Sequence, residues 1–135
     1  CLQARVYDLS KAIVKGDYNK AYSVLDTLFA MKEESISVLS VISGCYVDMY
    51  RAKCAKIAGE PVEDVANYYN YKGREFALRN AMRDCTALSV GQLRKSLDVL
   101  MQADNALKST GADKRLILEE TLVKLLLISK EVHYD

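Results

Sequence analysis

The sequence has 135 residues, of which half are apolar and 27% are charged, with 19 Lys and Arg against 18 Asp and Glu. A domain of this length buries enough surface to fold without a disulfide or a structural metal. Because the charges nearly cancel, no strong field favours a nucleic-acid or anionic-membrane partner.

Helical periodicity recurs along the chain, whereas alternating apolar and polar runs, which indicate strands, are almost absent. One proline and six glycines leave few breaks in these patterns. The sequence therefore predicts an all-α fold, a single bundle of about six or seven helices in one domain over residues 1–135. The expected helices span residues 7–15, 18–31, 35–58, 61–68, 74–88, 90–111 and 113–131.

Three of these segments carry further signals. Residues 35–58 form the longest segment and are apolar on more than one face, so we expect the central rod of the domain there. Polar residues such as Asp48 and Arg51 argue against a transmembrane helix in this segment. Ser89 and Gln92 have the spacing of a capping box, which predicts a helix start at residue 90. The last segment contains LILEETLVKLLLIS and should be buried on most sides, by its own domain or by a neighbouring subunit.

The stretch ADNALKSTG places Asp104 in line with the leucines of residues 93–107, and Lys108 follows four residues later. A lone carboxylate on such a stripe would incur a desolvation cost, so we expect Asp104 to be buried and paired with Lys108. The alternative is a catalytic base, but no histidine, serine motif or second carboxylate points to the same place. We interpret the pair as a structural motif and expect Asp104→Leu to be poorly tolerated.

A helix-turn-helix is the alternative interpretation of residues 61–85. The later part of this segment carries Lys72, Arg74, Arg79 and Arg83, and a helix-turn-helix would put its second helix in the major groove of DNA. Four interspersed carboxylates dilute this charge, and the apolar positions indicate a packed helix. DNA binding by this segment is therefore the less favoured interpretation.

The sequence contains nine tyrosines, which could stack on nucleic-acid bases. Tyr68, Tyr69 and Tyr71 lie beside a glycine and form a candidate exposed patch. Four others have the spacing of core and rim residues: Tyr18, Tyr22, Tyr46 and Tyr50. Three basic residues of the long helix are interpreted as a solvated face: Arg51, Lys53 and Lys56.

No motif indicates catalysis, nucleotide binding or a metal site, since the sequence lacks the P-loop, dinucleotide, H-E-x-x-H and G-x-S-x-G patterns. We therefore expect no catalytic residue, cofactor or metal ligand.

The cysteines Cys1, Cys45, Cys54 and Cys85 show no C-x-x-C spacing, and the one histidine is His133. Reduced, mostly buried thiols in a cytoplasmic protein are the simplest interpretation. The chain opens with neither an initiator Met nor a signal peptide, so we interpret it as part of a longer protein.

Several motifs follow one another in a recognisable order: YDLSKAIVKGDYNKAYSVLDTL, the long middle helix, FALRNAMRDCTALSVGQLRKSLDVLMQADNALKS and LILEETLVKLL. A short helix ends in Gly-Asp, an Arg-rich helix precedes a Ser-x-x-x-Leu step, AD-x-x-x-K follows, and the last helix is rich in leucine. This order resembles the C-terminal domain of the bacterial DNA polymerase III delta subunit, over nearly the whole chain.

The resemblance implies a clamp-loader subunit that helps to load the sliding clamp onto primed DNA during replication. In that family this domain is an all-helical bundle that joins the gamma/tau and delta prime subunits in a collar. The AAA+-like N-terminal domains, which are absent from this chain, contact the clamp and do not hydrolyse ATP. The resemblance therefore implies a non-enzymatic domain in a DNA polymerase III holoenzyme, a nucleotidyltransferase complex, with primer–template DNA bound by the whole assembly and no membrane partner.

The resemblance marks no interface residues, and we take exposed groups on the final helices as candidates. The loop of residues 109–115, with Lys108, Lys114 and Arg115 around it, is a candidate for approaching DNA near the collar. The alternatives are a helix-turn-helix DNA-binding domain and a free-standing helical adaptor.

Overall fold

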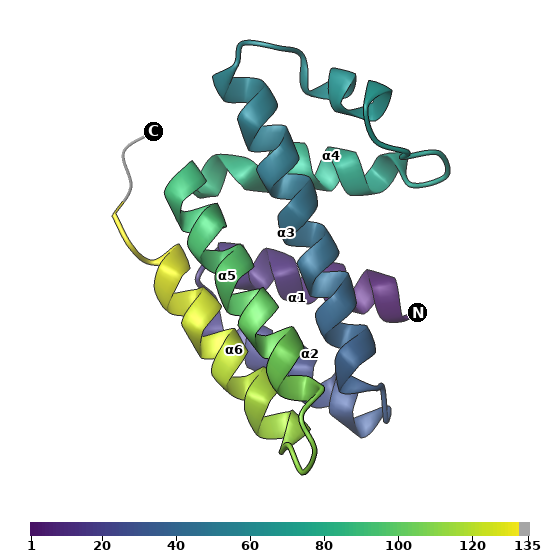
Figure 1. Cartoon of the computed structure of the whole chain (residues 1–135), viewed down its shortest axis with the longest axis vertical. Helices are drawn as coiled ribbons and strands as arrows, with labels where there is room; N and C mark the ends of the chain where they lie inside the picture. Colours follow the sequence, from purple (N-terminus) through teal and green to yellow (C-terminus); the bar gives the residue numbers. More distant parts are fainter. Residues whose placement is uncertain (133–135) are drawn as a thin grey trace.

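The computed structural model describes residues 1–132, and every regular element within them is a helix, which confirms the predicted all-α fold (Figure 1). In chain order the elements are α1 (Leu2–Val14), α2 (Tyr18–Ala30), α3 (Ser35–Ile57), the 3-10 helix η1 (Val62–Asn67), α4 (Glu75–Asp84), the 3-10 helix η2 (Cys85–Ala87), α5 (Val90–Leu107) and α6 (Lys114–Ser129). Within the described part, none of these helices has the length and apolar character needed to cross a membrane.

The long helix α3 lies at the centre of the bundle, as predicted from the sequence (Figure 1). Its 23 residues span about 35 Å. It contacts α1, α4, α5, α6 and η1. Val38, Ile42, Tyr46 and Met49 are buried and recur every three or four positions, which is the spacing of one helix face. In Figure 1, η1 and α4 lie beside the C-terminal half of α3, and α5 and α6 run as an antiparallel pair on its other side.

Helix α1 begins at Leu2, five residues before the start that we predicted. Val6 is fully buried and Leu2 packs against the core, so the apolar stripe of Leu9 and Ile13 continues toward the N-terminus. Helix α2 begins at Tyr18, as predicted, because the carboxylate of Asp17 accepts a hydrogen bond from the backbone N–H of Lys20 at 3.1 Å and caps the helix.

Other boundaries also differ from the prediction. The short fourth helix is a 3-10 helix preceded by Pro61, and the expected helix over 74–88 is α4 followed by the 3-10 turn η2. The helix expected to end near residue 111 ends at Leu107, and Gly111, with φ of 76°, lies in the following turn. Such ends depend on local capping contacts, which periodicity does not locate.

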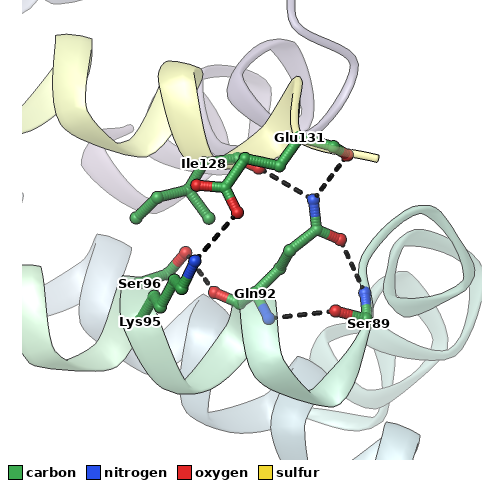
Figure 2. Close-up of polar contacts among 6 residues, drawn as sticks. All are labelled: Ser89, Gln92, Lys95, Ser96, Ile128 and Glu131. Carbon is green, nitrogen blue, oxygen red and sulfur yellow. Dashed lines mark hydrogen bonds and ion pairs between the residues drawn. The ribbon is translucent and has the colours of Figure 1, made fainter. Parts of the chain in front are cut away.

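The side chain of Gln92 joins the start of α5 to the end of α6 (Figure 2). The Ser89 hydroxyl accepts from the backbone N–H of Gln92 at 3.0 Å, and Gln92 Oε1 accepts from the Ser89 N–H at 2.8 Å, so the predicted capping box is confirmed. The Nε2 group of Gln92 also donates to the carbonyl oxygens of Ile128, at 2.8 Å, and Glu131, at 3.0 Å. One buried amide therefore caps two helix ends, and the ion pair of Lys95 with Glu131, at 3.0 Å, lies beside it.

Candidate functional site

Asp104 and Lys108 form an ion pair, with 2.8 Å between Oδ2 and Nζ, but the pair lies on the surface. The side chains are 41% and 65% exposed, so the expectation that Asp104 is buried was wrong. The stripe that α5 buries runs through Leu100, Ala103 and Leu107, and Asp104 lies next to it rather than in it. In water such a pair stabilises a helix by about 0.2–0.5 kcal/mol, which makes it a minor contact.

The basic residues around the loop of residues 109–115 differ in whether their charged groups are already bound within the chain. The ammonium of Lys108 is paired, and Arg115 is held by α2: its Nη2 lies 2.8 Å from Asp26 Oδ1 and its guanidinium lies 4.6 Å from the ring centre of Phe29. Lys114 is exposed, and within residues 1–132 its side chain has no ion pair or hydrogen bond. Of the three residues, Lys114 is therefore the most accessible to an external phosphate.

Exposed apolar side chains lie on α2 and along one face of α6, and we name this set the α2–α6 face: Tyr18, Tyr22, Leu116, Val123 and Leu127. These side chains are 36–62% exposed. Tyr18 and Tyr22 stack with their ring centres 6.0 Å apart, and a groove of about 410 Å³ lies between them and Val123. The last helix is thus not buried on most sides by its own domain. Tyr18 and Tyr22 are exposed, contrary to the prediction, whereas Tyr46 is fully buried and Tyr50 packs against the core, as predicted. The signal for this face was present in the sequence, since α6 is apolar nearly all round.

Tyr71 does not belong to the exposed patch that we expected around residues 68–71. Tyr68 and Tyr69 are exposed, but Tyr71 is only 3% exposed, and its hydroxyl donates to Asp48 Oδ1 at 2.6 Å. Arg74 Nη2 donates to the other carboxylate oxygen at 3.3 Å. Burial and the hydrogen bond to Asp48 raise the pKa of Tyr71, so the phenol stays a donor. A buried carboxylate on α3 therefore anchors the chain between η1 and α4.

The predicted solvated face on α3 is only partly present. The Arg51 guanidinium stacks on Tyr69, 3.5 Å from the ring centre, and its Nη1 donates to the Tyr71 hydroxyl at 3.3 Å. Lys53 is 8% exposed, which contradicts the prediction for that residue. Lys56 is exposed, but its Nζ donates to a backbone carbonyl at 3.1 Å. These cations mainly support the fold.

The segment considered as a helix-turn-helix packs against α3 through both of its helices. Helix α4 buries Ala77, Leu78 and Ala81. Two of the basic side chains bind carboxylates of this chain, since Arg74 contacts Asp48 and Arg83 contacts the adjacent aspartate at 2.9 Å. This arrangement gives the segment a role in packing.

The thiols are less buried than expected. Cys85 is buried and Cys45 is half-buried, whereas Cys1 and Cys54 are exposed. Burial raises the pKa of the Cys45 thiol to about 12, which keeps it protonated and a poor nucleophile. His133 lies outside the described residues, and residues 1–132 contain no cluster of three or more side chains that could hold a metal ion.

Comparison with known proteins gives one consistent result. The family model for the DNA polymerase III delta subunit, C-terminal domain, matches residues 3–125. The chain belongs to this family. It is 26% identical over 125 residues to the DNA polymerase III subunit delta of Bacillus subtilis, covering 93% of this chain and 35% of that protein. Its structure resembles the Bacillus subtilis DNA clamp loader delta protein with a TM-score of 0.85 at 25% identity, over 94% of this chain and 37% of that one. The chain therefore spans about a third of the length of these relatives.

Proposed function

We propose that this domain helps to assemble the clamp loader by packing against the C-terminal domains of other subunits in a collar. The observation that carries the proposal is the apolar α2–α6 face, in a chain that belongs to the delta-subunit family. The proposed partners are the gamma/tau and delta prime subunits. The domain acts as a single oligomerisation module and has no catalytic role of its own.

The composition of the α2–α6 face supports an interface. Aromatic residues are enriched at the centre of protein interfaces, and Tyr18 and Tyr22 provide two large rings that already stack on each other. Glu119, Glu120 and Lys124 line the same groove and supply a polar edge. An apolar centre with a charged rim is the usual organisation of such surfaces.

Contacts with the sliding clamp and with primer–template DNA are proposed for a full-length delta subunit, about three times as long as this chain. There, AAA+-like N-terminal domains would contact the sliding clamp, and the assembled loader would bind primer–template DNA in the cytoplasm. Lys114, the first residue of α6, is the residue that we propose to approach DNA near the collar, because its ammonium is exposed.

The proposal is tested by co-purification of this chain with the C-terminal domains of gamma/tau and delta prime. Val123→Asp and Leu127→Asp place a charge on the α2–α6 face at half-exposed positions, where the fold should tolerate it. Met101→Asp is the matched control, because Met101 is 60% exposed but lies on α5. We expect the first two variants to lose association and the control to retain it, with unchanged thermal melts for all three.

Two outcomes would contradict the proposal. Failure of the unmodified chain to associate with any of these domains would refute the collar, and full association of both Asp variants would refute the assigned face. Sequence-selective, salt-dependent DNA binding without subunit affinity would instead support a DNA-binding domain, and a stable monomer that binds only a peptide would support an adaptor.

A further inference from the structure

A second groove lies between α3 and the segment that contains η1, and we name it the α3–η1 groove. It has a volume of about 490 Å³, which is in the range of about 300–1,000 Å³ typical of ligand sites. Ala55, Pro61 and Val65 line it with apolar groups, and Tyr50 and Tyr68 add aromatic rings. In Figure 1 η1 lies at the C-terminal end of α3, away from α2 and α6, so this groove is separate from the α2–α6 face.

The outer wall of the α3–η1 groove is fixed to α3 at several points. The carboxylate of Asp48 binds Tyr71 at 2.6 Å and Arg74 at 3.3 Å, and Arg51 stacks on Tyr69 at 3.5 Å. Asp48 is buried, with 6% of its side chain exposed, which strengthens these contacts. A groove that is already formed loses little conformational entropy when a ligand binds.

The charge available in the α3–η1 groove is negative. Glu60 and Asp64 line it, and neither carboxylate has an ion pair or a side-chain hydrogen bond within residues 1–132. Arg51 is the cation of the lining, but it is occupied by Asp48, Tyr69 and Tyr71. Arg94 is not part of the lining and donates to the Tyr50 hydroxyl at 3.1 Å, on the wall opposite η1. Because two unpaired carboxylates repel phosphates and attract cations, the groove favours a basic ligand over nucleic acid.

We propose that the α3–η1 groove binds a basic peptide segment of another protein. An apolar or aromatic side chain of the peptide occupies the space beside Val65 and Tyr68, and its Lys or Arg residues face Glu60 and Asp64. Charge complementarity at the rim supplies the specificity, and the apolar lining supplies the affinity. The proposal does not depend on the collar, because the α2–α6 face lies elsewhere.

The exposed thiol of Cys54 provides a direct reporter, since it lines the α3–η1 groove, and the exposed thiol of Cys1 is an internal control. The probe is a short synthetic peptide of alternating lysine and leucine with a central phenylalanine, and its counterpart carries glutamate in place of lysine. We measure peptide affinity by fluorescence anisotropy and the rate of N-ethylmaleimide labelling at each cysteine by mass spectrometry. We expect the lysine peptide to slow labelling of Cys54 but not of Cys1, and the glutamate peptide to affect neither.

Charge-reversal variants locate the binding site. Glu60→Lys combined with Asp64→Lys should weaken binding of the lysine peptide by more than about tenfold, whereas Glu119→Lys with Glu120→Lys, the same change in the α2–α6 groove, should alter it by less than about twofold. Thermal melts establish that both variants fold. Equal binding of the two peptides, equal losses in the two double variants, or no protection of Cys54 would each overturn the proposal.

Discussion

Replacing Gln92 tests whether one side chain links α5 to α6. Its amide makes three hydrogen bonds, to the Ser89 N–H and to the carbonyl oxygens of Ile128 and Glu131, and the residue is 3% exposed. Gln92→Ala removes all three bonds. Gln92→Glu keeps an acceptor for Ser89, as in an ordinary capping box, but removes both donors. The two variants therefore separate the cap of α5 from the link to α6.

The magnitude follows from the number of bonds that each variant loses. A hydrogen bond contributes about 0.5–1.5 kcal/mol net, so Gln92→Ala should lower the free energy of unfolding by about 1.5–4.5 kcal/mol. Gln92→Glu loses two of the bonds and places a carboxylate against the carbonyl oxygens at the negative end of α6. Desolvation of that charge adds to the cost, so at neutral pH this variant should be at least as unstable as Gln92→Ala.

The pH dependence of Gln92→Glu has a defined sign. Burial and the adjacent carbonyl oxygens favour the protonated form, and we expect them to outweigh the Ser89 N–H, which favours the carboxylate. The pKa of the introduced carboxyl should therefore be raised in the folded state. A raised folded pKa stabilises the protein below the pKa of the unfolded chain, and this stability is lost as the pH rises. The deficit relative to the unmodified chain should therefore be smaller near about pH 4–5 than at neutral pH.

Urea unfolding followed by circular dichroism at the helical band measures these differences. The control is Gln102, an exposed glutamine on the same helix, replaced by Ala and by Glu. Both control variants should stay within about 0.5 kcal/mol of the unmodified chain. The reasoning is refuted if Gln92→Ala is no less stable than the Gln102 control, or if Gln92→Glu matches the unmodified chain at neutral pH.

Tyr71 and Tyr46 give a further comparison, because only the hydroxyl of Tyr71 has a hydrogen-bond partner among the described residues. Tyr71→Phe should cost about 1–3 kcal/mol, because Asp48 loses its closest donor, whereas Tyr46→Phe should leave the thermal midpoint unchanged or raise it, because the buried Tyr46 hydroxyl has no hydrogen-bond partner among the described residues. Equal shifts in the two melts would contradict this assignment. Asp104→Leu should change the free energy of unfolding by less than about 1 kcal/mol, since its pair with Lys108 is exposed, and a loss above about 2 kcal/mol in urea unfolding would show that the carboxylate has a buried role.

Local patterns predicted much of the fold. The central helix was expected over residues 35–58 and is Ser35–Ile57. This prediction was possible because apolar spacing reflects contacts within a few residues of chain. The capping box at Ser89 and Gln92 was predicted for the same reason. The fold class and most helix positions are thus properties of short stretches of sequence.

The candidate surfaces were harder to predict, as Asp104 illustrates. Its position in the leucine pattern indicated burial, but α5 turns Ala103 and Leu107 inward and leaves Asp104 at the edge. Asp48 was noted only as a polar residue of the long helix, and nothing in the sequence identified Tyr71, among the nine tyrosines, as its hydrogen-bond partner. Periodicity therefore indicates the apolar face of a helix, but it does not identify the side chains from other helices that pack against that face.

The sequence by itself determined that the chain is helical, where most helices begin, and which family it resembles, because capping and apolar spacing act over about four residues. Only the tertiary structure decided which polar side chains hold the bundle together and which apolar ones remain exposed. Gln92 reaches Ile128 across 36 positions and Asp48 reaches Tyr71 across 23. Such contacts depend on how whole helices pack, and the same packing leaves the α2–α6 face and the α3–η1 groove open.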